Sequence, residues 1–239
     1  MADHDAATSD LRSAVERLYE VMARHPRPGS IAFCDHCVSH EENARLLRVP
    51  LRQLTADDLD RYAWKSMSTW GDEADFRHFL PRLLDLVVTG QLDYLSGPDR
   101  LIQKTTVSGL SAEESAVVRR LLDAWWAVTL TRHPAPHTAY TVLEALSAAV
   151  DDPAPYLAVF EQANGQAHAQ HLADLVGDWE YTSARDDAWS RSIERWMTSP
   201  TPARLLEAAT LAADTPQVAT ALSEAYEHAS TIYECHRQR

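Results

Sequence analysis

Hydrophobic side chains recur at intervals of three and four residues along most of the chain, and this period is typical of amphipathic helices. The first such helix is predicted over residues 10–24, with Ser9 or Asp10 as its N-cap. Its apolar positions are Leu11, Val15, Leu18, Tyr19 and Met22. The strict alternation that marks a half-buried strand is missing, so the pattern indicates one helix after another.

Several predicted helices begin at a Ser or Thr that is followed three residues later by an acidic residue. In such a capping box the first side chain accepts a helical N–H, and the acidic side chain reaches back to the N–H of the cap. We expect capping boxes at Ser39 with Glu42, Thr55 with Asp58, and Ser111 with Glu114. Asp72 is expected to start a further helix.

Pro81 stands inside the otherwise helical pattern of residues 76–84. Proline has no N–H to donate, and its ring clashes with the preceding helical turn. We therefore expect a break or kink, with Pro81 in the first turn of a helix that runs to Thr89. Gly90 is the expected C-terminal stop.

The second half of the chain continues in the same way. A wide apolar stripe after the capping box at Ser111 predicts a central buried helix. Further helices are predicted over residues 137–150, 153–163, 166–177, 186–197, 201–213 and 216–236. The tryptophans expected to anchor the core and the helix interfaces are Trp125, Trp126, Trp179, Trp189 and Trp196.

These elements predict an all-α fold of about ten helices packed as antiparallel pairs. Several units are roughly 30 to 40 residues long, so a solenoid-like arrangement is an alternative, although no repeat consensus is visible. The Pro-rich stretch at residues 133–137 is the expected boundary between an N-terminal helical part, 1–132, and a C-terminal helical part, 133–239. One continuous domain is the other arrangement that the pattern allows.

Charge and composition narrow the classes of partner. The chain has 22 basic and 35 acidic residues, a formal net charge of -13, which disfavours a nucleic-acid or anionic-lipid surface. No apolar run reaches the roughly 20 residues that span a bilayer. Three cysteines make no disulfide framework, and no secretory signal pattern opens the chain. We therefore expect a cytoplasmic protein whose partners are proteins or small molecules.

Cys34 and Cys37 are separated by two residues, and His40 follows three residues later. A turn with this spacing can supply two thiolates to a zinc ion, and His40 is a candidate third ligand. A complete site would need tertiary partners, for which His36, Cys235 and His236 are candidates. Two alternatives stay open: a redox pair activated by the helix N-terminus, and two cysteines buried in a loop.

A second candidate site is the segment of residues 64–82. It places ionisable side chains beside aromatic ones, as a ligand pocket or a partner-binding groove would. The candidate binding residues are Trp70, Asp72, Arg77, His78 and Arg82. The alternative is that the aromatic residues form the core while the charged residues form a solvated face with capping and ion-pair roles. Arg82 is the residue that packing explains least.

Two histidine pairs are weaker candidates for a metal site. His168 and His171 share a helical face, with Glu161 or Asp174 as further donors. His133 and His137 flank two prolines. A transition-metal site needs at least three convergent ligands, so the alternative for each pair is an ordinary polar surface.

The N-terminal segment of residues 31–90 combines the Cys-x-x-Cys with Thr69-Trp70-Gly71-Asp72 and Phe79-Leu80-Pro81-Arg82-Leu83-Leu84. With this combination the segment resembles an uncharacterised family of bacterial all-helical proteins. The resemblance implies a helical unit and no particular activity.

No nucleophile motif, phosphate-binding glycine loop or metalloprotease histidine pair is visible in the sequence. We therefore expect a cytoplasmic helical interaction or scaffold protein, with a structural zinc at the Cys-x-x-Cys. The alternative is a small-molecule-binding protein or metal-dependent enzyme with a pocket near residues 64–82.

Overall fold

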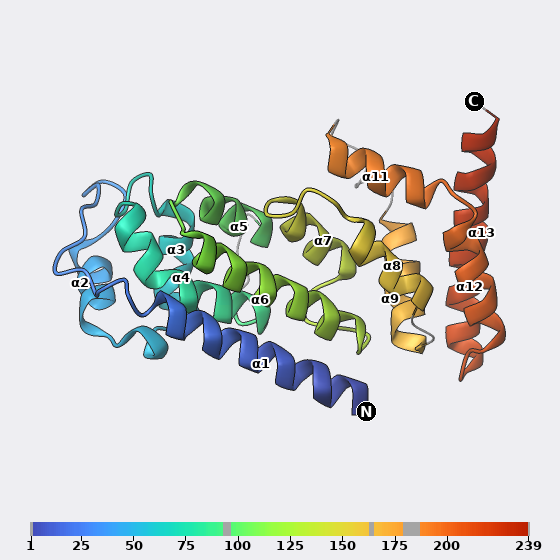
Figure 1. Ribbon diagram of the computed structural model, residues 1–239, viewed down its shortest axis with the longest axis horizontal. Helices are drawn as coiled ribbons and strands as arrows, with labels where there is room; N and C mark the ends of the chain where they lie inside the picture. Colours follow the sequence, from blue (N-terminus) through green and yellow to red (C-terminus); the bar gives the residue numbers. More distant parts are fainter. Residues whose placement is uncertain (1, 93–96, 163–164, 179–186, 239) are drawn as a thin grey trace. The chain divides into compact units, whose positions relative to one another are not determined.

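A computed structural model describes residues 2–92, 97–162, 165–178 and 187–238. The chain is 72% helical, with twelve α-helices and no strand in the described ranges (Figure 1). The all-α class predicted from the periodicity is confirmed, and the number of helices is close to the expected ten. Within these same ranges no helix is both long enough and apolar enough to cross a bilayer.

The chain forms two compact units, which are described separately: residues 6–125, and residues 1–5 together with 126–239. The helices that begin before residue 126 are α1 (Ala2–Met22), α2 (His40–Arg48), the 3-10 helix η1 (Leu51–Gln53), α3 (Ala56–Lys65), α4 (Glu73–Val88), α5 (Pro98–Val107) and α6 (Ala112–Leu130). Those that follow are α7 (Ala139–Ser147), α8 (Ala154–Gln162), α9 (Gln166–Gly177), α11 (Ala188–Met197), α12 (Thr201–Leu211) and α13 (Pro216–Arg237).

The predicted capping boxes are confirmed. Ser39 and Glu42 exchange their two hydrogen bonds at the start of α2, and Thr55 and Asp58 do so at the start of α3. The backbone N–H of Ser111 donates to the Glu114 carboxylate at 2.7 Å, and the backbone N–H of Glu114 donates to the Ser111 hydroxyl at 3.3 Å. Asp72 begins α4 by accepting from two backbone N–H groups. Local hydrogen bonding therefore sets where these helices begin.

The predicted start of the first helix is wrong. The helix α1 begins at Ala2, one residue after the chain start and well before the expected cap at Ser9 or Asp10. Asp3 and Asp5 lie in its first turn, where negative charge stabilises the helix dipole. The alanines of this segment also have high helix propensity, so the polar start of the chain extends the helix.

The predicted break at Pro81 is also wrong. The helix α4 runs from Glu73 to Val88 with Pro81 inside it. Its buried residues are Phe76, Phe79, Leu80, Pro81, Leu83, Leu84, Leu86, Val87 and Val88. Burial of this apolar surface outweighs the cost of one missing hydrogen bond. The helix ends where expected, because Gly90 adopts the left-handed conformation with φ 69°.

The helix α5 is an element that the sequence analysis did not predict. It begins at Pro98, after Gly97 with φ 80°. Its Lys104 ammonium donates to the carbonyls of Ala63, Trp64 and Ser66, at 2.6, 2.9 and 3.0 Å. Lys104 therefore binds the C-terminal carbonyls of α3, where a cation also offsets the helix dipole. Burial lowers the pKa of Lys104 to about 8.

In the C-terminal unit, aromatic side chains hold the first helices together. The ring of Trp126 meets Tyr156 and Phe160 edge to face, with centroids 6.2 and 5.8 Å apart. Trp126 and Trp189 are buried as predicted, and so is Trp125 in the N-terminal unit, whereas Trp196 is half-buried and Trp179 lies outside the described residues. Farther along the chain, α12 and α13 pack on each other and on α9 (Figure 1).

The capping box of α2 makes stability depend on pH through Glu42. The Ser39 hydroxyl and N–H, and then Arg61, lower the pKa of Glu42 below 4.5. A lowered folded-state pKa stabilises the fold above pH 4.5, and this stabilisation is lost as pH falls through the folded pKa. In urea denaturation, Glu42→Gln is expected to lower the free energy of unfolding above pH 4.5, with a difference from wild type that shrinks on acidification. Glu41→Gln, in the same first turn but outside the box, is the control; an equal pH profile for both variants would contradict the assignment.

Candidate functional site

The Cys-x-x-Cys segment forms a tight turn held against the start of α4. The N–H groups of Cys37 and Val38 both donate to the Cys34 carbonyl, at 2.8 and 3.0 Å. The N–H of Cys34 donates to the carbonyl of Thr69 at 2.9 Å. Cys34 is exposed and Cys37 is half-buried, so the alternative of two buried cysteines is wrong. The turn instead presents the Cys34 thiol at the surface.

The electrostatics of the turn favour a thiolate at Cys34. The backbone N–H of His36, and then the side chain and backbone of Cys37, hydrogen-bond the Cys34 sulfur and lower the pKa of its thiol. Both an ion-binding thiolate and a reactive thiolate need such stabilisation. The turn therefore stabilises the thiolate form of Cys34, which both zinc binding and redox activity would require.

The proposed third zinc ligand does not join the two cysteines. The His40 side chain is 87% exposed, with its Nε2 3.9 Å from Asp35, and its ring lies edge to face with Phe33. Across the described residues, Cys34, Cys37 and His40 do not form a group of three converging ligands. Cys235 and His236, two of the further candidates, lie on α13 in the C-terminal unit. Zinc binding at the Cys-x-x-Cys stays a prediction.

Trp70, a predicted binding residue, is a core residue with 2% of its surface exposed. Its indole Nε1 donates to Asn43 Oδ1 at 2.8 Å, and Asn43 in turn donates to the carbonyl of Ile31 at 3.3 Å. Trp70 also forms an isolated antiparallel bridge with Phe33. This buried chain of hydrogen bonds joins the Cys-x-x-Cys loop to α2 and to the start of α4.

Two further predicted residues hold helix ends. Asp72 is the N-cap of α4, and its Oδ1 accepts the N–H groups of Ala74 and Asp75 at 2.8 and 3.0 Å. Arg77 Nη1 donates to the carbonyl of Ser108, the C-cap residue of α5, at 2.5 Å. The capping and ion-pair roles that the sequence allowed as an alternative account for both side chains.

Arg82 likewise binds a backbone carbonyl at the C-terminal end of η1. Its Nε donates to the carbonyl of Leu54 at 2.7 Å, and its Nη1 pairs with Asp85 at 2.7 Å. The Tyr19 hydroxyl donates to the same Asp85 carboxylate at 3.1 Å. Burial, followed by the Asp85 charge, raises the pKa of Tyr19 well above its ordinary value. Arg82 thus joins α1, η1 and α4 through a polar network that its sequence position did not reveal.

His78, a predicted binding residue, lines a cavity in the N-terminal unit. This cavity has a volume of about 590 Å³, and its walls include Tyr19, His25, Arg27, Arg52, His78 and Pro81. Its cationic groups already have partners: Arg52 pairs with Glu16 at 2.7 Å, and Arg27 donates to the carbonyls of Leu47 and Val49. His78 Nδ1 lies 3.1 Å from the carbonyl of His25, and burial lowers the pKa of His78.

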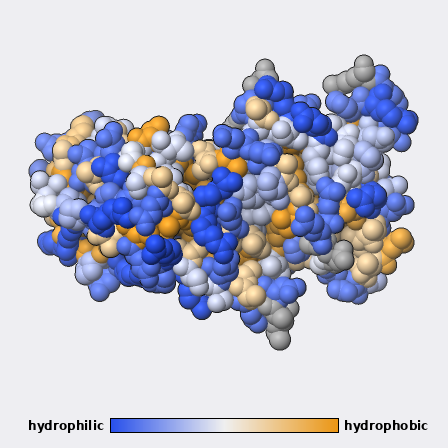
Figure 2. All heavy atoms as spheres, viewed as in Figure 1, coloured by the Kyte–Doolittle hydropathy of each residue, from blue (hydrophilic) through white to orange (hydrophobic). Residues whose placement is uncertain are grey.

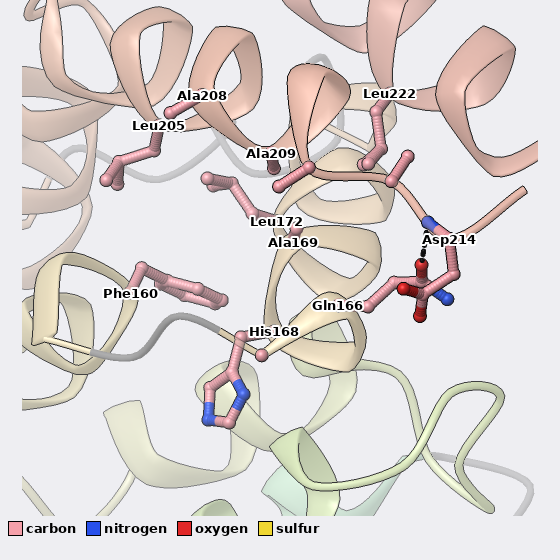
Figure 3. Close-up of a pocket in the computed structure, with 13 residues that line it drawn as sticks. Phe160, Gln166, His168, Ala169, Leu172, Leu205, Ala208, Ala209, Asp214 and Leu222 are labelled. Carbon is pink, nitrogen blue, oxygen red and sulfur yellow. Dashed lines mark hydrogen bonds between the residues drawn. The ribbon is translucent and has the colours of Figure 1, made fainter.

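A second cavity, of about 470 Å³, lies in the C-terminal unit (Figure 3). Apolar side chains from four helices, α8, α9, α12 and α13, and from the segment after α12 form its walls: Phe160, Ala169, Leu172, Leu205, Ala208, Ala209, Ala212, Ala213 and Leu222. Its polar residues are Gln166, His168 and Asp214, and Gln166 Oε1 accepts the N–H of Asp214 at 3.0 Å. The sequence analysis did not predict this cavity, although the run of alanines near the end of α12 is its visible signal.

The structure pairs the histidines differently from the sequence prediction. His171 lies beside His133, with ring centroids 4.9 Å apart, and Asp174 Oδ2 is 2.7 Å from His133 Nε2. His168 lines the apolar cavity instead. Burial lowers the pKa of both His168 and His171. His171 and Asp174 were recognisable as neighbours on one helix, but their meeting with His133 was not.

The hydrogen bond of Trp70 gives a direct test of the core assignment. Trp70→Phe removes the indole N–H and leaves the buried Asn43 Oδ1 without its donor. We expect the free energy of unfolding, measured by urea denaturation, to fall by about 1–3 kcal/mol. Trp64→Phe is the control, because Trp64 is 57% exposed and its replacement should change stability by less than about 0.5 kcal/mol. Equal losses in the two variants would refute the role given to Trp70.

The lowered pKa of Cys34 predicts selective alkylation. At pH 7 a larger thiolate fraction should make iodoacetamide modify Cys34 several-fold faster than the exposed Cys235 of the same chain. Cys37→Ala removes one hydrogen bond to the Cys34 sulfur and should slow the reaction of Cys34. Time-resolved peptide mass spectrometry measures both rates. Similar rates at Cys34 and Cys235 would show that the turn does not activate its thiol.

Comparisons with known proteins do not assign a function to either unit. No protein-family model, no curated protein and no solved structure matches the chain. The resemblance of residues 31–90 to an uncharacterised bacterial family therefore stays a hypothesis.

Proposed function

We propose that the protein is a helical interaction protein of the cytoplasm whose C-terminal unit binds an amphipathic helix of a partner protein. The observation that carries this proposal is the apolar cavity between α8, α9, α12 and α13 (Figure 3). Helix-in-groove recognition uses an apolar groove that accepts side chains spaced three and four residues apart. The three free cysteines agree with a reducing compartment.

The walls of the cavity suit a helix. Leu172, Leu205 and Leu222 supply apolar contacts, while the alanines of α12 and its C-terminal end leave room for a close approach. Leu211, at the end of α12 and outside the lining of the cavity, is 87% exposed. The face in view in Figure 2 otherwise mixes hydrophilic and hydrophobic residues over both units. The groove is thus a concavity with apolar walls that can accept a partner helix.

Charge indicates the chemistry of the partner. Asp214 lies in the lining of the cavity, Glu207 is exposed on α12, and the whole chain has a net charge of -13. A helix with basic residues beside its apolar face would gain electrostatic attraction as well as apolar contact. The same charge disfavours nucleic acid as the partner.

A small anionic molecule in the cavity beside His78 is the second candidate, because arginine and histidine side chains gather there. Arg52 already pairs with Glu16, and Arg27 already donates to two backbone carbonyls. These guanidinium groups are the positive charges that an anionic ligand would need. A bound anion would have to displace these partners. The apolar groove requires no such rearrangement, and we therefore prefer it.

Site-specific photo-crosslinking in the cells that make the protein tests the groove. A benzophenone amino acid at Ala212, an exposed lining position, is expected to crosslink one protein segment with apolar residues at helical spacing flanked by Lys or Arg. Ala208→Trp fills the groove and should lower the crosslink yield by at least about tenfold, equivalent to 1.4 kcal/mol of binding. Peptide mass spectrometry identifies the segment.

Glu207→Trp is the matched control, because it adds the same side chain at an exposed α12 position that does not line the cavity. Its crosslink yield should equal that of the parent. A yield that Ala208→Trp leaves unchanged, or the absence of any crosslinked protein segment, would refute helix binding in the groove.

A further inference from the structure

Three potential metal ligands converge within the C-terminal unit, and none of them belongs to the Cys-x-x-Cys. One ring nitrogen of His133, one of His171 and a carboxylate oxygen of Asp174 all lie within 4.8 Å of one another. His171 and Asp174 are three residues apart on α9 and so share a helical face, while His133 follows the end of α6. In the described part of the chain, this is the one group of three or more such ligands that converges this closely.

The surroundings of His171 favour a cation. The side chain is 1% exposed, and its Nε2 lies 2.9 Å from the carbonyl oxygen of Arg132. Because a carbonyl only accepts, Nε2 carries the proton and Nδ1 keeps its lone pair. No hydrogen bond reaches the buried Nδ1 atom. A buried nitrogen without a partner costs free energy, and an ion ligated through Nδ1 would satisfy it.

The contact with Arg132 is also the kind of support that metal sites use. A histidine ligand commonly donates its other ring N–H to a backbone carbonyl, which fixes its tautomer and orientation. His133 Nε2 and Asp174 Oδ2 lie 2.7 Å apart, which is a hydrogen-bond distance, so an ion bound by both atoms would replace this contact. A partly exposed His–Asp pair such as His133 and Asp174 is common and is weak evidence for a metal by itself. The buried imidazole of His171 beside it is the unusual feature, because its orientation is fixed and its Nδ1 has no partner.

We propose that His133, His171 and Asp174 bind a divalent transition-metal ion, with Zn²⁺ as the preferred ion. Two imidazoles and one carboxylate form a ligand set typical of zinc, whereas Ca²⁺ and Mg²⁺ prefer oxygen ligands alone. Three protein ligands leave one tetrahedral position for water or another donor. The side chains of His133 and Asp174 are 21% and 43% exposed, so solvent reaches the cluster from their side.

Such an ion would connect the end of α6 to α9, and it is independent of helix binding in the groove. Ala169 and Leu172 of α9 line the apolar cavity, whereas His171 and Asp174 do not. The metal site and the groove therefore use different residues of the same helix. Loss of one does not require loss of the other.

Calorimetric titration of ZnCl₂ into the full chain tests the site. The protein carries Cys34→Ser, Cys37→Ser and Cys235→Ser, so that thiols contribute no binding. We expect one zinc per chain, and affinity at least about 100-fold lower in His133→Asn and in Asp174→Asn, since even the loss of an outer-shell partner costs 10–100-fold. These two ligands are the more exposed ones, and circular dichroism checks that both variants remain folded.

His168→Asn is the matched control, because His168 lies on the same helix outside the cluster and should leave the affinity unchanged. Co²⁺ in place of Zn²⁺ should show a visible spectrum of nitrogen and oxygen ligands without a thiolate charge-transfer band. No stoichiometric binding by the cysteine-free chain would overturn the proposal. Binding that persists unchanged in both His133→Asn and Asp174→Asn would overturn it equally.

Discussion

Nine of the sixteen residues of α4 are buried, and the neighbouring elements of the N-terminal unit are arranged around this apolar helix. A helix with apolar residues on most of its circumference must lie in a core, because no single neighbour can cover it. Pro81 belongs to this buried surface, which explains why the helix continues through it. The burial of α4 is therefore the constraint that determines where its few polar side chains can emerge.

Those polar side chains reach the ends of other helices. Arg77 binds the C-cap carbonyl of α5 and Arg82 that of η1, while Lys104 of α5 binds the last carbonyls of α3. The carbonyls at a helix C-terminus lack intrahelical partners and carry partial negative charge, so a cation satisfies both needs. Side chains that resemble a ligand-binding cluster in the sequence thus have a structural role in the fold. The possible sites of function lie elsewhere, at the exposed Cys34 turn and in the C-terminal unit.

The C-terminal unit is built with less burial per helix. In α13, a helix of 22 residues, the buried residues are Leu222 and Ala229. Apolar surface that the unit itself does not cover remains accessible in the groove between α8, α9, α12 and α13. On α9, Leu172 lines this groove while His171 takes part in the imidazole and carboxylate cluster. One helix therefore supports two different surfaces, one suited to apolar contact and one to a cation.

The sequence by itself determined what depends on neighbours along the chain. Hydrophobic period determined the all-α class, and the capping boxes at Ser39, Thr55 and Ser111 determined three helix starts, because these hydrogen bonds join residues three apart. The zinc-like spacing of Cys34 and Cys37 and the shared face of His171 and Asp174 are local in the same sense.

Only the tertiary structure decided what depends on residues far apart in the chain. It kept α4 continuous at Pro81, because long-range burial outweighs one local hydrogen bond. It left His40 at the surface and placed His133 beside His171, 38 positions apart by their residue numbers. It also assigned Arg77 and Arg82 to the carbonyls of Ser108 and Leu54. Side-chain convergence of this kind is a property of packing, and periodicity and spacing contain no information about it.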